Sequence, residues 1–133
     1  MMGFFDIFRK KTKLTEQEHQ WNMMWELWVD GMAESPYAQL MTYESEVNNG
    51  GHSQYFLNVS NCGDLQKDID VLLDILPSPL RGNLKAGYEA FMAQADDCDD
   101  ANEELFEEYD DVFYENEELI TSILRVYADG LTF

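Results

Sequence analysis

The sequence predicts an all-α fold: a single compact domain of about five to seven helices, with a long acidic helical region at its C-terminal end. Helix-capping residues precede several segments in which apolar side chains recur every three or four residues. No segment shows the sustained alternation of apolar and polar residues that is typical of a strand. The 133 residues, 45% of them hydrophobic, suffice for one core. We therefore expect an N-terminal arm at 1–14 and one helical domain at 15–133.

Two capping signals predict the first helices. The capping box Thr15-Glu-Gln-Glu18, followed by a tryptophan- and methionine-rich stripe, predicts a helix at about 16–33. Ser35 as N-cap and Pro36 as first helical residue predict a second helix that ends at Asn48. The paired glycines of Asn48-Asn-Gly-Gly51 then predict a turn with positive φ, so that valine at Gly50 should be costly.

The remainder of the chain also reads as helical. His52–Ser60 predicts a short third helix, closed by a left-handed residue at Gly63. Asp64 is the N-cap of a fourth helix, which stops before Pro77, and a fifth includes Leu84 to Ala95. Apolar residues spaced mainly by three and four continue from Leu105 to Tyr127. They predict one long helix or two that meet between 111 and 116.

The charge is strongly acidic. Twenty-seven acidic and eight basic residues give a net charge of −19, which repels nucleic acid and anionic membranes and attracts basic proteins. Half of the basic residues, Arg9, Lys10, Lys11 and Lys13, follow the apolar cluster of Phe4, Phe5, Ile7 and Phe8 in the arm. Two cysteines without a C-x-x-C pattern, and the lack of any long apolar stretch, predict free thiols, no membrane span and a cytoplasmic location.

The densest negative charge lies between Asp96 and Glu118, a segment of 23 residues without lysine or arginine. A helix that is merely solvated usually places lysine or arginine at i+4 from its glutamates, because like charges at that spacing repel. Thirteen carboxylates in a helix of about 34 Å would approach the linear charge density of DNA. We predict a partner-binding acidic surface of Asp96, Asp97, Asp99, Asp100, Glu103, Glu104, Glu107, Glu108, Asp110, Asp111, Glu115, Glu117 and Glu118. The alternative is a solvated acidic face without a partner.

The segment Glu46-Val-Asn-Asn-Gly-Gly-His-Ser-Gln-Tyr-Phe-Leu-Asn58 resembles the signature of the family named after a nineteen-kilodalton bacterial DNA-mimic protein. A weaker resemblance to the same family covers most of 15–130. The family resemblance implies a helical domain that is often a homodimer. The protein after which the family is named uses its carboxylates as a decoy for the DNA-binding surface of a transcription factor. His52 departs from the pattern, because the family usually carries phenylalanine there. The resemblance therefore implies that phenylalanine is tolerated at this position.

The residues of this motif have mainly structural interpretations. Gly50 and Gly51 form the turn, Tyr55 and Phe56 carry the apolar side of the next helix, and polar side chains can satisfy the exposed backbone groups of the turn. The motif residues are Glu46, Asn48, Asn49, Gly50, Gly51, Gln54, Tyr55, Phe56 and Asn58. The functional alternative is a small enzyme with a polar pocket of Glu46, His52 and Gln54.

Other chemistry finds little support in the sequence. The aspartates at 96–100 lack the spacing of an EF-hand, and Glu16-x-x-His19 lacks the second copy that a di-iron bundle needs. We predict no catalytic residues, no metal site and no cofactor. The leading hypothesis is a non-enzymatic module that binds a basic protein, such as a DNA-binding transcription regulator. An immunity protein or antitoxin that covers a basic nuclease would use the same electrostatics.

Overall fold

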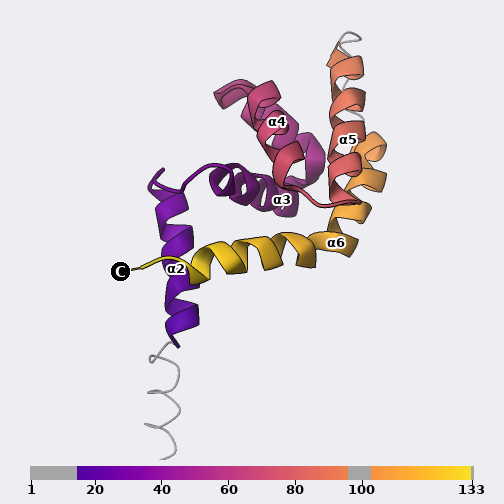
Figure 1. Ribbon diagram of the computed structural model, residues 1–133. Helices are drawn as coiled ribbons and strands as arrows, with labels where there is room; N and C mark the ends of the chain where they lie inside the picture. The colour runs from indigo at the N-terminus through magenta and orange to yellow at the C-terminus, as the bar shows by residue number, and fades with distance from the viewer. Residues whose placement is uncertain (1–14, 96–102, 133) are drawn as a thin grey trace, which may run out of the picture.

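Five helices make up the described part of the chain, residues 15–95 and 103–132 of a computed structural model (Figure 1). Their bounds are α2 Glu16–Val29, α3 Tyr37–Cys62, α4 Leu65–Ile75, α5 Leu80–Ala95 and α6 Glu103–Asp129. The described residues contain no strand. The prediction of an all-α fold is therefore confirmed.

The capping box starts α2 as predicted, but a glycine ends the helix four residues early. The Thr15 hydroxyl accepts a hydrogen bond from the Glu18 N–H at 3.1 Å. At the other end Gly31 has a φ of +74°, and the Met32 N–H donates to the Leu27 carbonyl at 2.7 Å. This left-handed cap stops α2 at Val29 rather than near residue 33.

The paired glycines kink α3, as the sequence indicates, although the strained residue is the second glycine. Gly50 is non-helical but keeps a negative φ, with φ −157° and ψ 20°, whereas Gly51 has φ +76° and ψ −177°. A Cβ at Gly50 would still collide with the Gln54 side chain, so the cost of Gly50→Val comes from packing and not from a positive φ. Two end signals were wrong: Pro36, not Ser35, is the N-cap, and Gly63 is extended with φ −165°.

The later helix ends follow the sequence closely. The Asp64 carboxylate accepts from the Lys67 N–H at 3.1 Å and starts α4. Leu76 follows α4 in an extended conformation, as expected for a residue that precedes a proline. Helix α5 then packs against α4 on one side and α6 on the other.

Helix α6 is one continuous helix that connects the two ends of the domain. Figure 1 shows that it bends: its first part runs beside α5, and its last part passes α3 and reaches α2. Its buried side chains meet those of the other helices in a single core. The core residues are Met24, Leu40, Met41, Tyr43, Val47, Tyr55, Phe56, Val59, Leu65, Ile69, Leu72, Leu76, Leu80, Leu84, Phe106, Phe113, Ile120, Leu124 and Ala128.

Candidate functional site

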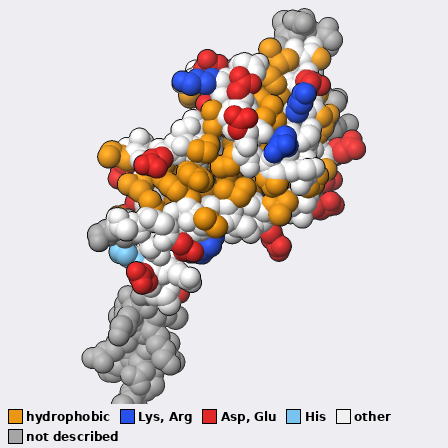
Figure 2. Space-filling model, viewed as in Figure 1, with side chains coloured by type: hydrophobic (Ala, Val, Ile, Leu, Met, Phe, Trp, Pro, Cys, Tyr) orange, Lys and Arg blue, Asp and Glu red, His pale blue; other side chains and the backbone are white. Residues whose placement is uncertain are grey.

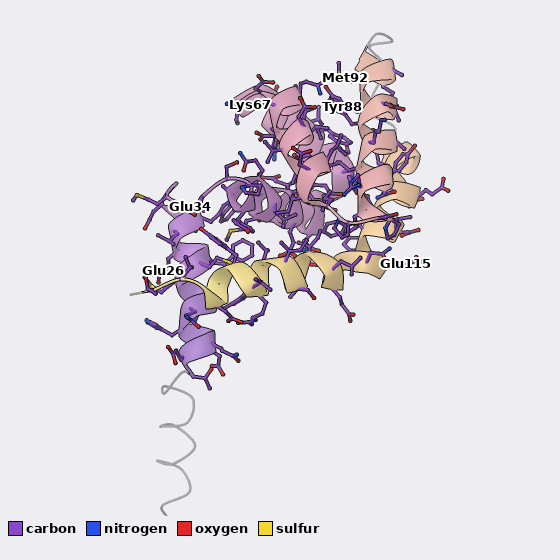
Figure 3. All side chains as sticks on the ribbon, in the orientation of Figure 1. Glu26, Glu34, Lys67, Tyr88, Met92 and Glu115 are labelled. Carbon is purple, nitrogen blue, oxygen red and sulfur yellow. The ribbon has the colours of Figure 1, made fainter. Side chains whose placement is uncertain are left out.

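A row of exposed carboxylates follows the outer side of α6. Glu107, Asp111, Glu115 and Glu118 are three or four residues apart and therefore share one helix face, and Glu108 lies beside them, also exposed. Among the described residues none of the five forms an ion pair with lysine or arginine. Figure 2 shows acidic side chains along the margin of the molecule where the first part of α6 lies. In Figure 3, Glu115 points away from the body of the protein. We call these five residues the acidic stripe.

The other predicted surface carboxylates fall into two groups. Asp96, Asp97, Asp99 and Asp100 lie outside the described residues, and the side chains of Glu103 and Glu104, in the first turn of α6, are also outside them. Asp110 and Glu117 are half-buried and face α3. Asp110 binds His52, and Glu117 accepts a hydrogen bond from the Asn48 amide at 2.8 Å. These two carboxylates join α6 to α3 instead of facing outward.

A polar cluster of Tyr43, His52 and Asp110 lies beside the kink of α3; the Tyr43 and His52 side chains are fully buried, and Asp110 is half-buried. Asp110 Oδ1 accepts from the His52 backbone N–H at 2.8 Å and lies 2.6 Å from His52 Nδ1. On the other side of the ring, His52 Nε2 lies 2.6 Å from the Tyr43 hydroxyl. Phe113 packs edge-on against both rings. The His52 side chain, with no exposed surface, is therefore part of the protein interior.

The partners of His52 define its tautomer. A carboxylate oxygen can only accept, so Nδ1 carries the proton of the neutral ring and donates it to Asp110. Nε2 is then the acceptor, and the Tyr43 hydroxyl donates to it. Burial, with the nearby Tyr55 and Asp110 groups, raises the pKa of Tyr43 well above its usual value, which keeps the hydroxyl protonated as this arrangement requires. Both ring nitrogens are thus occupied within the protein.

Three polar residues of the motif, Glu46, Gln54 and Asn58, bond to one another rather than to backbone groups. Glu46 Oε2 accepts from the Gln54 amide at 2.9 Å and from the Asn58 amide at 2.8 Å, which ties the two halves of α3 together across the kink. Glu46 and Asn58 also line a shallow hollow of about 240 Å³ beside Cys62, and His52 does not line it. The polar pocket of Glu46, His52 and Gln54 that the sequence offered as an alternative is therefore not formed. Glu46 and Gln54 bond to each other, whereas His52 bonds to Tyr43 and Asp110.

Glu44 is a buried carboxyl group that the sequence does not single out. It lies on the inner side of α3 with 8% of its surface exposed, and its Oε2 has no hydrogen-bond partner among the described residues. Burial, and next the Glu117 carboxylate on α6, raise the pKa of Glu44 to about 7. Its position among apolar residues at 40, 41, 43 and 47 indicates an inward-facing side chain, but only the packing of α6 places Glu117 nearby.

Glu44 makes the stability of the protein depend on pH. Its pKa in the folded protein lies above its ordinary value of 4.5, so unfolding releases a proton between these pH values. The contribution of Glu44 to the free energy of unfolding should fall as pH rises from about 4.5 to 7 and stay low above pH 7. The loss is at most about 3 kcal/mol. We expect Glu44→Gln to unfold at higher urea than the parent at pH 8 and to match it near pH 4.5. Glu89→Gln, an exposed change on α5, is the control, and a similar gain in that variant would contradict the assignment.

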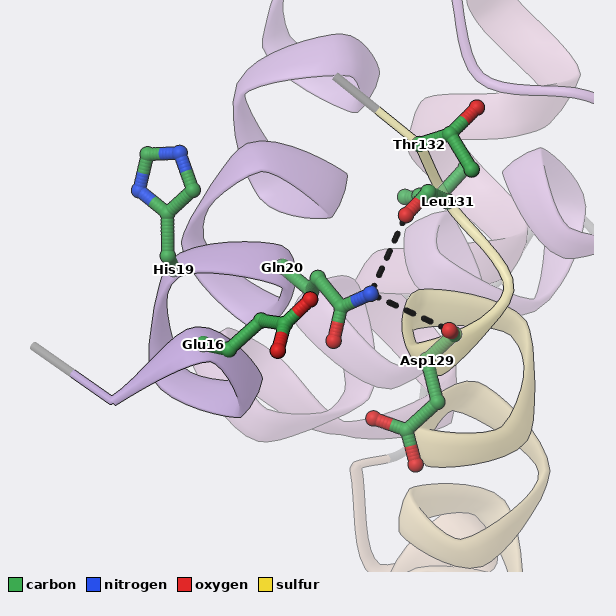
Figure 4. A pocket seen from close by; sticks show the side chains of 6 residues that line it. All are labelled: Glu16, His19, Gln20, Asp129, Leu131 and Thr132. Atoms are coloured by element: carbon green, nitrogen blue, oxygen red, sulfur yellow. Dashed lines mark hydrogen bonds between the residues drawn. The ribbon is translucent and has the colours of Figure 1, made fainter.

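A second hollow, of about 560 Å³, lies where the first turn of α2 meets the end of α6 (Figure 4). The Gln20 amide donates to the carbonyls of Asp129 and Leu131, both at 3.1 Å, and fixes the end of α6 to α2. His19 is exposed at its rim beside Glu16. Within residues 15–95 and 103–132, no group of three or more His, Cys, Asp or Glu side chains is arranged to hold a metal ion.

Comparisons with protein-family models, with curated proteins and with solved structures yield no match. None of the helices in the described part of the chain is long and apolar enough to cross a membrane. The residues and geometry described above are therefore the basis for a functional proposal.

Proposed function

We propose that this protein is a non-enzymatic interaction module whose acidic helix occupies the basic, DNA-binding surface of a partner protein such as a transcription regulator. The observation that carries the proposal is the acidic stripe: five exposed carboxylates on α6, none of which forms an ion pair with lysine or arginine among the described residues. Repulsion between like charges at i+4 costs a few tenths of a kcal/mol per pair. A surface that retains this repulsion suits a partner that supplies the missing positive charge.

The spacing of the stripe suits a surface that binds DNA. From Glu107 to Glu118 the helix rises by about 17 Å, so that five carboxylates give roughly one charge per 3–4 Å. One strand of duplex DNA presents a phosphate about every 3.4 Å. Arginine and lysine side chains arranged for a DNA strand could thus meet carboxylates at a similar interval.

The helix that carries the stripe is held in place before any partner binds. Phe106, Phe113, Ile120 and Leu124 of α6 are buried in the core, and Asp110 and Glu117 bond to α3 from the same helix. Binding a partner should therefore cost little conformational freedom of the α6 backbone. The occupied nitrogens of His52 also favour a structural role for this residue over a catalytic one.

Charge-neutralising variants test the proposal. Affinity capture from the native cell at moderate salt supplies the candidate partner, which is then purified for titration. We expect Glu107, Glu108, Glu115 and Glu118, changed together to glutamine, to weaken binding by about 2 kcal/mol, or roughly thirtyfold in Kd, at about 0.5 kcal/mol per exposed charge. Glutamine keeps the shape and helix propensity of glutamate, so folding should be unaffected.

A matched control separates the stripe from the overall charge. Glu18, Glu26, Glu34 and Glu89 are also exposed, and changing all four to glutamine gives the same net charge, from −19 to −15. Figure 3 places Glu26 and Glu34 by α2, away from Glu115. This control should bind the partner as the parent does, and binding of the parent should weaken as salt rises. Equal affinities for the two quadruple variants would refute the proposal.

Competition with DNA distinguishes the mimic from the immunity alternative. A decoy for a DNA-binding regulator should displace that regulator from its own duplex site in a concentration-dependent manner. An immunity protein should instead inhibit cleavage by a nuclease. Capture of a nuclease that is inhibited in this way would support the alternative and exclude the regulator.

A further inference from the structure

One face of α6 carries both exposed apolar side chains and carboxylates. This face lies near the first turn of α2, where the described chain begins. Val126 is 75% exposed and Leu119 is 37% exposed. They are two helical turns apart and so lie on the same side of the helix, beside Glu115 and Glu118. We call the surface formed by Glu115, Glu118, Leu119 and Val126 the outer face of α6.

The segment that precedes α2 has the complementary composition. Phe4, Phe5, Ile7 and Phe8 are apolar, and Arg9, Lys10, Lys11 and Lys13 are half of all the basic residues in the chain. Aromatic side chains match the exposed Leu119 and Val126, and the four cations match the carboxylates next to them. The other basic residues, at 67, 81, 85 and 125, all lie in the described domain.

The point where this segment joins the domain lies within reach of the outer face. Arg125 Nη1 donates to the Gln17 carbonyl at 3.3 Å, and its guanidinium group lies 4.4 Å from the centre of the Trp21 ring. The first turn of α2 is thus beside residue 125 of α6, next to Val126. From residue 125 the helix extends by only about 9 Å to Leu119. The eight residues from Phe8 to Glu16 can span up to roughly 26 Å.

We propose that the basic, aromatic segment 1–14 docks within the same molecule on the outer face of α6, around Leu119 and Val126, and covers the carboxylates beside them. Docking would make the segment a built-in competitor of any basic ligand of α6. A linked ligand acts at an effective concentration in the millimolar range, so even weak contacts suffice to occupy the face. The inference depends on the exposed face and the composition of the segment, and it does not require the partner proposed above.

Paramagnetic relaxation in the full-length chain tests the docking directly. In a Cys62→Ser, Cys98→Ser background, Asp6→Cys carries a nitroxide, and amide signals are compared before and after its reduction. We expect the Leu119, Ser122 and Val126 amides to lose most of their intensity, while Ile69 and Leu72 of α4 do not. Leu119→Ser with Val126→Ser should abolish the effect. Uniform broadening, broadening centred on other helices, or none would overturn the proposal.

A mixing experiment identifies the occupant. Spin-labelled protein without isotope label is added to isotope-labelled protein without the nitroxide, so that any broadening must arise between molecules. Unchanged signals support docking within one molecule. Broadening at Leu119 and Val126 in the mixture would overturn it in favour of a second copy of the chain.

Neutralising the segment tests whether it covers the carboxylates. Changing Arg9, Lys10, Lys11 and Lys13 to glutamine in the full chain should strengthen the binding of a short oligolysine peptide several-fold at low salt, because the internal competitor is lost. A matched pair separates the competitor from the net charge: Lys10→Gln with Lys11→Gln should strengthen peptide binding more than Lys67→Gln with Lys85→Gln, which loses the same two charges outside the segment. Equal affinity for the parent and the fourfold glutamine variant would contradict the proposed cover. If no complex with a regulator were found but the oligolysine result were as expected here, the proposed function would fail and the docking of the segment would stand.

Discussion

Replacing Asp110 by alanine should lower the free energy of unfolding by about 3 kcal/mol, because two buried donors lose their acceptor at a cost of about 1–3 kcal/mol each. The His52 N–H and Nδ1 both bond to Asp110 Oδ1, and the ring has no exposed surface. Asp110→Asn keeps an oxygen that can accept both bonds and should cost only about 1 kcal/mol. Urea denaturation of the three proteins measures the difference.

The neighbouring aspartate provides the control for Asp110. Asp111 is exposed, so Asp111→Ala should change stability by no more than about 0.5 kcal/mol. If Asp110→Ala were as stable as Asp111→Ala, the buried cluster would contribute nothing to the fold.

His52→Phe belongs to the same test. This change leaves the buried Tyr43 hydroxyl without its acceptor, so we expect the free energy of unfolding to fall by about 2 kcal/mol. The family resemblance had indicated tolerance at this position.

Gly51→Ala should cost about 3–4 kcal/mol for two separate reasons. The backbone at Gly51, with φ +76° and ψ −177°, lies in a region that is essentially restricted to glycine, where other residues lose about 1–3 kcal/mol. A Cβ at this position would also collide with the Asp110 carboxylate, whose Cγ would lie 3.1 Å away. The added methyl group would therefore disturb the hydrogen bonds from Asp110 to His52. Thermal and urea denaturation measure the loss.

A second glycine with positive φ separates strain from collision. Gly31 has φ +74°, but a Cβ there would have no neighbour within 4 Å, so Gly31→Ala should cost only about 1 kcal/mol. In addition, Gly51→Ala should cost less in the Asp110→Ala background than in the parent, because the colliding carboxylate is absent. Strictly additive effects of the two changes would show that Gly51 does not need its space next to Asp110.

The helices of this protein were determined largely by the local sequence. Thr15 and Asp64 cap α2 and α4 with side-chain bonds to residues three positions later, so a short segment contains all the information that is needed. The glycine pair kinks α3 for an equally local reason. The predicted ends of α2 and α3 were wrong by only a few residues.

The roles of the polar side chains were decided by the tertiary structure. Asp110 and Asp111 are adjacent and chemically identical, yet one is bonded to a histidine 58 positions earlier and the other is exposed. Glu44 has a pKa of about 7 because α6 buries it and brings Glu117 close, and neither cause is local in sequence. A run of carboxylates gives the charge of a helix, whereas the packing of α6 against α3 decides which of them remain exposed and which join the core. Burial and long-range hydrogen bonds depend on contacts between helices, and such contacts exist only once the chain has folded.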